Sequence, residues 1–240
     1  MKKVLSTMAI LATATAVFAQ GYLNFNAAGI PIVQTNTAVS TLFGGLGSGG
    51  VTGNTFGSAT ATYYYALLIS PYTGTITSDK AVWDGSWAVG QGVSGPITTV
   101  NLAGAGRVSA ATGAGANPFQ TSSAGAGWAA GTYYNIVLVG WSANLGSTWS
   151  VVSGELSAIA LGGTAAPNEF FGESDLGYLT PNVASPGAAI FGAAADANGL
   201  PIDNGSANPM YLYALPVPEP GTMALAGLGG LALMLIRRRK

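Results

Sequence analysis

The sequence predicts an all-β fold, an antiparallel β-sandwich of jelly-roll type, for the central part of this chain of 240 residues. Short runs rich in β-branched and aromatic residues alternate with glycine, serine, asparagine and proline, which is typical of antiparallel strands joined by turns. The 36 glycines agree with a fold that contains many turns. Because 49% of the residues are hydrophobic, the chain can bury a core although only 7% are charged.

Seven segments carry the strand pattern. In chain order they are residues 22–26, 61–69, 81–89, 132–141, 149–161, 188–191 and 211–215. The fourth is apolar at both odd and even positions, which favours a strand covered on both faces or central in a sandwich.

Glycine-rich segments separate these strands. Seven glycines in residues 41–57 predict a long flexible loop or the tip of a hairpin. Residues 102–115 and 121–131 are rich in alanine, but glycine recurs in them and costs about 1 kcal/mol relative to alanine inside a helix. Loops or irregular strands are therefore expected there.

The N-terminal residues 1–19 are predicted to be a cleavable signal peptide. Lys2 and Lys3 form a positive start, and an apolar stretch follows that is too short and too weakly apolar for a stable membrane span. Small or short side chains at Val17 and Ala19 place the cleavage between Ala19 and Gln20. A retained N-terminal anchor and a buried helix are the alternatives. Residues 20–216 are then the exported β-domain.

The C-terminal residues 217–240 have three parts in a fixed order. They are the motif Val217-Pro218-Glu219-Pro220, the apolar run 221–236 and the basic end Arg237-Arg238-Arg239-Lys240. The two prolines fix their own φ angles and lack N–H groups, so Glu219 is expected on an exposed, extended segment. As a helix the apolar run would measure about 24 Å, which is short for a bilayer core of about 30 Å but sufficient for a single transmembrane helix if the bilayer thins or the arginines snorkel.

The order of these three parts resembles the PEP-CTERM sorting signal over residues 217–240. The resemblance implies recognition by an exosortase, a membrane protease, with cleavage near Pro218-Glu219-Pro220. It also implies that the protein crosses the inner membrane, is held there transiently by the C-terminal helix, and then reaches the cell surface or the extracellular space. The basic end agrees with this orientation because clusters of Lys and Arg stay on the cytoplasmic side.

The composition excludes several classes of function. The chain has no His and no Cys, which excludes imidazole-based triads and thiolate nucleophiles and removes the two main zinc ligands. Between Gln20 and Val217 the chain has two basic and eight acidic residues, which gives a net charge of −6. Nucleic-acid binding is not expected, since it depends on Lys and Arg that neutralise phosphates.

Two groups of acidic residues each have two chemical interpretations. Glu169, Glu173 and Asp175 are the densest acidic cluster, and either a glycosidase-like acid/base pair or a solvated acidic loop explains them. Asp196, Asn198 and Asp203 offer oxygen ligands for calcium, but they lack the bidentate Glu of an EF-hand, and an ordinary turn accounts for the same residues. No other cofactor is expected.

Aromatic residues support two interpretations of the domain. Tryptophan and tyrosine faces can stack on the sugars of a polysaccharide, whereas aromatic residues in strands usually pack into the core. The sequence therefore favours a non-enzymatic structural protein of the cell surface or matrix, associated with exopolysaccharide or biofilm. The alternative is a carbohydrate-binding or adhesin module, and a carboxylate-dependent glycan hydrolase ranks third.

Overall fold

The structure is a computed structural model that describes residues 20–25, 33–54, 63–77, 80–101, 108, 119–121, 128–192, 194–203, 209–217 and 234. The predicted signal peptide 1–19, the motif residues Pro218, Glu219 and Pro220, and the basic end 237–240 lie outside the described residues. The same holds for the predicted apolar helix 221–236 apart from Met234. The described residues therefore belong almost entirely to the domain between these two ends.

A ten-stranded sheet is the centre of the domain. Its main path runs through β14 (Gly199–Leu200), β12 (Gly177–Leu179), β10 (Tyr134–Ser142), β11 (Phe170–Glu173), β15 (Met210–Ala214), β2 (Val33–Val39) and β3 (Thr52–Asn54). A branch leaves β10 through β4 (Tyr63–Pro71), which also pairs with β5 (Ala88–Val89) and β8 (Thr98–Val100).

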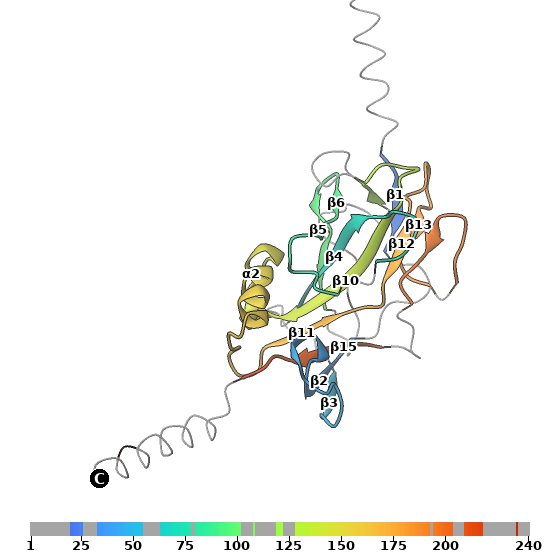
Figure 1. Cartoon of the computed structure of the whole chain (residues 1–240). Coiled ribbons are helices and arrows are strands. Elements are labelled where there is room, and N and C mark those ends of the chain that lie inside the picture. The colour runs from blue at the N-terminus through green and yellow to red at the C-terminus, as the bar shows by residue number, and fades with distance from the viewer. Residues whose placement is uncertain are drawn as a thin grey trace, which may run out of the picture.

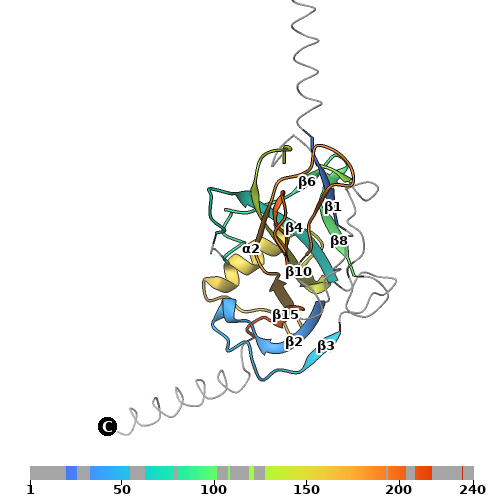
Figure 2. The ribbon, with the colours of Figure 1, turned by 90° about the vertical axis from the view of Figure 1, so that its right-hand side faces the viewer.

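Smaller elements surround this sheet. They are a three-stranded sheet of β13 (Ala188–Ala189), β1 (Tyr22–Asn24) and β9 (Phe119–Gln120), the pair β6 (Gln91–Gly92) and β7 (Gly95–Pro96), the 3₁₀ turns η1 (Thr41–Phe43) and η2 (Ala143–Leu145), and the helix α2 (Trp149–Ala160). Figure 2 shows β1 and β6 at one end of the domain and β2 and β3 at the other.

The antiparallel pair of β4 and β10 is buried on both faces. The two strands pair continuously from Tyr134 opposite Pro71 to Ser142 opposite Tyr63. Even-numbered residues of β10 such as Leu138 belong to one apolar core, and odd-numbered residues such as Val137 belong to a second. This confirms the prediction that residues 132–141 form a strand covered on both faces.

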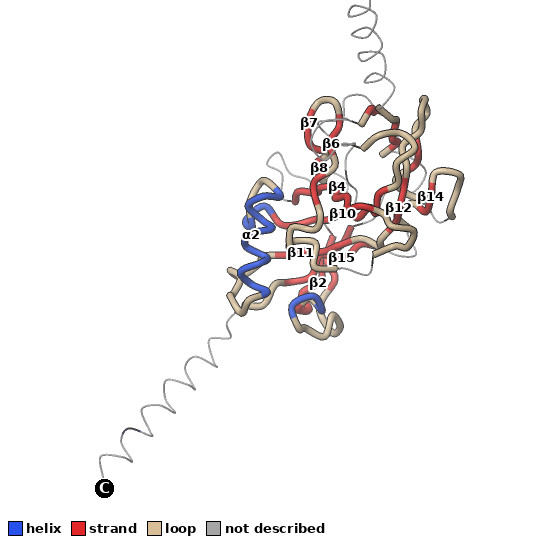
Figure 3. The backbone as a smooth tube through the Cα atoms, turned by 45° about the horizontal axis from the view of Figure 1, so that its top comes forward, coloured by secondary structure: helices blue, strands red, loops and turns tan. Residues whose placement is uncertain are grey.

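The helix α2 covers one face of this pair, and it corrects the prediction of a strand over residues 149–161. Its buried residues, Trp149, Val152, Leu156 and Ile159, lie three or four positions apart and so form one stripe of a helix. They pack on residues of β4 and β10 in one core. Figures 1 and 3 show α2 lying against the strands beside β10 and β11. The β-branched and aromatic residues of this segment favour a strand, which is why the strand prediction failed although the apolar spacing fits a helix.

The opposite face of the pair is covered by strands and loops. Its core includes Leu23 of β1, Ala188 of β13 and the fully buried Trp128, together with Leu67 of β4 and Leu138 of β10. The domain therefore has a central sheet between a helical layer and a layer of short strands, and its core is built on both sides of β4 and β10.

Two strand pairs are parallel, so the expectation of a purely antiparallel arrangement is wrong for them. β2 pairs with β15, and β1 pairs with β13, each in parallel. Both pairs join segments more than one hundred residues apart in the chain. Local alternation of apolar residues carries no information on the direction of such distant partners. The described residues nevertheless form a mostly β domain, as predicted.

Other strand predictions agree with the structure to within a few residues. Predicted strands 22–26, 61–69, 188–191 and 211–215 correspond to β1, β4, β13 and β15. Of the predicted strand 81–89 only β5 is a strand, because the Asp84 carboxylate accepts a hydrogen bond from the Ser86 N–H and forms a turn. The predicted loop 41–57 contains η1 and β3. Residues 102–131 lie mostly outside the described part of the chain.

Gly154 offers a test of the α2 assignment. A Cβ atom at this exposed helical position would meet no atom within 4 Å. Gly154→Ala is therefore expected to raise the free energy of unfolding by about 1 kcal/mol, because alanine loses less backbone entropy in a helix. Urea denaturation measures the change. As a control, Gly140→Ala in β10 should destabilise, since its Cβ would lie 2.7 Å from the Tyr65 ring. A destabilising Gly154→Ala would contradict the helix.

Candidate functional site

The folded domain holds the chain up to the residue before the sorting motif. The N–H of Leu215 donates to the carbonyl of Glu169 at 2.9 Å, and the N–H of Ala165 donates to the carbonyl of Pro216 at 2.9 Å. Val217 is the next residue and is 41% exposed. In the sequence, Val217 alone separates Pro216 from the Pro-Glu-Pro residues. The fold therefore leaves almost no linker between itself and the motif.

Glu169 organises this exit of the chain. Its carbonyl accepts the hydrogen bond from Leu215, and its Oε2 accepts one from the N–H of Ala166 at 2.8 Å. Because the carboxylate closes the loop that follows α2, its contacts assign Glu169 a structural role at the point where the tail leaves the domain.

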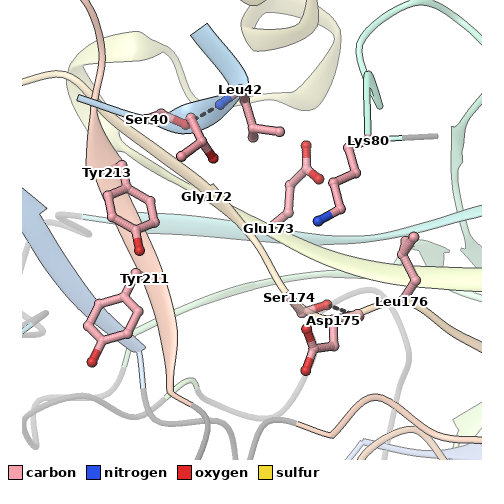
Figure 4. A pocket seen from close by; sticks show the side chains of 11 residues that line it. Ser40, Leu42, Lys80, Gly172, Glu173, Ser174, Asp175, Leu176, Tyr211 and Tyr213 are labelled. Atoms are coloured by element: carbon pink, nitrogen blue, oxygen red, sulfur yellow. Dashed lines mark hydrogen bonds between the residues drawn. The ribbon is translucent and has the colours of Figure 1, made fainter. Parts of the chain in front are cut away.

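Glu173 and Asp175 line a cavity of about 230 Å³ between β11, β15 and η1. Figure 4 shows the Lys80 ammonium group directed toward the Glu173 side chain, and Tyr211 and Tyr213 on the β15 side of the cavity. The hydroxyl group of Ser174 accepts a hydrogen bond from the N–H of Leu138 and donates one to the carbonyl of Asp175. The serine of this wall thus stabilises the local backbone.

The three acidic residues do not form a carboxylate pair of glycosidase geometry. Phe170–Glu173 is strand β11, which corrects the prediction of a loop there, and Glu169 precedes it directly. The Glu169 carboxylate is bound to the Ala166 N–H in the loop that follows α2, and Glu169 does not line the cavity that Glu173 and Asp175 share. Figure 4 shows the carboxylates of Glu173 and Asp175 pointing away from each other.

The predicted calcium loop contains a tight turn at Asp196. Asp196 and Gly199 exchange two backbone hydrogen bonds, and the N–H of Asn198 donates to Asp196 Oδ1 at 2.7 Å. Asn198 Nδ2 lies 3.4 Å from Asp196 Oδ2. Asp203 follows Ile202, which bridges to Phe191. Within the described ranges, no three His, Cys, Asp or Glu side chains are placed to hold a metal ion. The hydrogen bonds of Asp196 are those of an ordinary turn.

The tryptophans pack into the core, as the packing interpretation predicts. Trp87, Trp128, Trp141 and Trp149 are at most 8% exposed. Trp83 is partly buried and stacks on Phe43 with ring centroids 4.9 Å apart. Four of these rings are thus buried, and the fifth packs against the core. Tryptophan content is therefore explained by core packing.

Three tyrosines behave differently, and sequence reasoning missed two of them. Tyr72, Tyr133 and Tyr178 contact one another at the surface, and Tyr133 is 37% exposed. Tyr72 and Tyr178 are separated by more than one hundred residues, so their proximity could not be read from local pattern. A usable signal was the position of Tyr72 beside the turn-forming segment Thr73-Gly74.

The surroundings of three described residues, Tyr72, Tyr63 and Asp84, shift their pKa values. Desolvation, followed by the adjacent Tyr178, raises the pKa of Tyr72, and burial raises the pKa of Tyr63. Hydrogen bonds with Ser86 lower the pKa of Asp84.

Within the described part of the chain, no helix has the length and apolar character needed to cross a membrane. The comparisons with known proteins concern the C-terminus. A family model described as the PEP-CTERM protein-sorting motif matches residues 216–240. The match begins at Pro216, whose carbonyl accepts the hydrogen bond from the Ala165 N–H. Neither a curated protein nor a solved structure matches the chain significantly.

Proposed function

We propose, from the premise that this chain carries a C-terminal PEP-CTERM protein-sorting motif, that its β-domain is a non-enzymatic structural component of the cell surface or extracellular matrix. The motif supports secretion through the membrane and processing by an exosortase, a membrane protease. The domain is then the part that remains after processing, and its own properties decide what it does outside the cell.

The observation that carries the proposal is that the matched motif starts at the last residue of the described domain that a backbone hydrogen bond ties to the fold. Pro216 is held by Ala165, and the matched motif starts at Pro216. Removal of the chain beyond the Pro-Glu-Pro segment would leave the β-sheet and both cores intact, because no described core residue lies beyond Leu215. This supports a folded domain that ends where the sorting motif begins.

The non-enzymatic part of the proposal rests on chemistry. The chain has no His or Cys, which removes imidazole and thiolate chemistry and leaves the carboxylates as the candidates that the sequence singled out. Of the acidic cluster, Glu169 is bound to the Ala166 N–H and does not line the cavity, and Glu173 and Asp175, which do, point apart. We further propose that the matrix partner is an exopolysaccharide, which a protein sorted to the surface would meet.

Mass spectrometry of the protein from the cells that make it tests the proposal. We expect a mature chain that begins at Gln20, ends near Pro218–Pro220, and is found in the surface or extracellular fraction. An intact Lys240 confined to the membrane fraction would contradict sorting and leave a tail-anchored protein. Hydrolysis of a polysaccharide by the purified protein that is abolished in Glu173→Gln would contradict the non-enzymatic role.

A further inference from the structure

Three surface tyrosines, Tyr72, Tyr133 and Tyr178, form what we name the tyrosine cluster. The rings of Tyr72 and Tyr178 are stacked with centroids 4.5 Å apart and planes 5° apart. Tyr133 tilts against both at 6.1 Å and 5.9 Å, and its hydroxyl donates to the carbonyl of Ala197 at 3.3 Å. Mutual stacking and this hydrogen bond hold the rings in place, so the cluster is an ordered aromatic surface.

The register of the sheet places the cluster on the face that α2 covers further along. Asn135 of β10 lies directly opposite Ser70 of β4 and opposite Tyr178 of β12, so the three side chains share one face. Tyr133 lies two positions before Asn135, on the same side. Val137, two positions after it, packs in the core under α2. The face therefore changes from apolar core to exposed aromatic surface along β10.

A polar cavity of about 430 Å³ lies at this transition. Pro71 and Thr73, which line it, flank Tyr72 in the chain, and the buried Trp87 closes it toward the core. The other lining groups are the side chains of Ser70, Thr75, Ile76, Thr77, Ser86 and Asn135. None of the lining residues is charged, and most carry a hydroxyl group.

Asn135 holds the wall of the cavity in shape. Its Nδ2 donates to the Pro71 carbonyl at 2.8 Å and lies 3.3 Å from Ser70 Oγ, and its Oδ1 accepts from the Thr77 N–H at 3.3 Å. One buried side chain thus ties together both ends of the segment 71–77. A cavity framed in this way needs little ordering when a ligand binds, which favours affinity.

The cluster lies at the opposite end of β10 from the exit of the tail. β10 starts directly after Tyr133 and ends at Ser142, whose hydroxyl group accepts a hydrogen bond from the N–H of Phe170 at the start of β11. The strand is nine residues long, about 30 Å. Figure 1 shows α2 and the last described residues at the lower left and β12 at the upper right. A ligand at the cluster would not collide with a membrane or a protease at the tail.

We propose that the tyrosine cluster and its cavity bind a segment of an uncharged polysaccharide. A sugar ring has an apolar face of C–H groups that suits the aromatic surface and hydroxyl groups that suit the threonines and serines of the cavity. A charged ligand would find no ion-pair partner among the lining residues. The proposal deepens the proposed function, on which it rests, by naming the ligand class and the residues that contact it.

Affinity electrophoresis of the purified protein in gels that contain single neutral polysaccharides (a soluble β-glucan, an α-glucan and a galactomannan) tests the proposal. We expect retardation by at least one of them, unchanged by added salt. Tyr72→Ala should weaken this binding about ten-fold, corresponding to about 1.4 kcal/mol. Thr75→Val, which keeps the shape of an exposed side chain and removes its hydroxyl, should also weaken it. Tyr211→Ala is the matched control, because Tyr211 pairs with Tyr213 on β15, away from the cavity.

Thermal melting of each variant separates loss of binding from loss of fold. The proposal is overturned by no retardation in any gel, by retardation only with an anionic polysaccharide, or by equal losses in Tyr72→Ala and Tyr211→Ala. A properly sorted, cleaved protein that binds no polysaccharide would refute this inference and leave the proposed surface role standing. An uncleaved protein whose polysaccharide binding depends on Tyr72 would support this inference and refute the proposed surface role.

Discussion

Replacement of Trp141 by alanine is expected to lower the free energy of unfolding by about 3–5 kcal/mol, the usual cost of truncating a buried large aromatic residue. Trp141 is 1% exposed at the end of β10, opposite Tyr64 of β4 and Phe171 of β11. Its ring packs on Trp149 of α2 at a centroid distance of 5.8 Å, and its indole N–H donates to the carbonyl of Gly146 at 2.9 Å. The variant would therefore lose contacts among the sheet, the helix and the connecting turn together.

Denaturant unfolding followed by tryptophan fluorescence or circular dichroism measures this effect. Leu161→Ala is a suitable control, since Leu161 is 90% exposed just after α2 and its truncation should change stability by no more than about 0.5 kcal/mol. A Trp141→Ala variant as stable as this control would contradict the packing of α2 on the sheet described above. The cost is large relative to the total stability of about 5–15 kcal/mol that is typical of a domain.

Replacement of Pro218, Glu219 and Pro220 by three alanines is expected to abolish processing of the tail. Proline disfavours a helix at the motif, and alanines would allow the helix that the sequence predicts for residues 221–236 to extend backward. Because the fold holds the chain at Pro216, the motif has no spare linker that could restore an extended segment. We expect the full-length variant to accumulate in the membrane fraction and the mature form to disappear from the surface fraction.

Intact-mass measurement of the protein in the membrane and surface fractions tests this prediction. Glu155→Ala is the matched control for the lost carboxylate, because Glu155 is exposed on α2 and its replacement changes the net charge equally. This control should be processed normally. Normal cleavage of the triple-alanine variant would mean that the processing enzyme does not read the motif in this chain.

The strands at the centre of the fold could be predicted because their signal is local. β10 and β4 carry β-branched, aromatic and aliphatic residues at both odd and even positions. Over nine residues this pattern is typical of a strand that is buried on both faces. α2 was missed although its spacing is equally local, because Trp149, Val151 and Val152 are also strong strand formers. Tertiary packing of the helical stripe decided between the two.

The candidate binding surface shows the opposite limit. Tyr72, Tyr133 and Tyr178 come from three separate segments of the chain. Strand pairing brings these segments together, because Asn135 lies opposite both Ser70 and Tyr178, and its side chain also donates a hydrogen bond to the Pro71 carbonyl. Four of the five tryptophans, for which the sequence allowed a sugar-binding interpretation, are buried in the core, and the sequence gives no sign that the three tyrosines lie together.

The sequence by itself determined the β class, the exclusion of imidazole and thiol chemistry, and the C-terminal sorting motif. Each depends on composition or on residues adjacent in the chain, so no knowledge of distant contacts is needed. The tertiary structure alone decided the parallel pairing of β2 with β15 and the assembly of the tyrosine cluster beside a polar cavity. These features arise from strand register between distant segments, and register is set by the packing of the whole core.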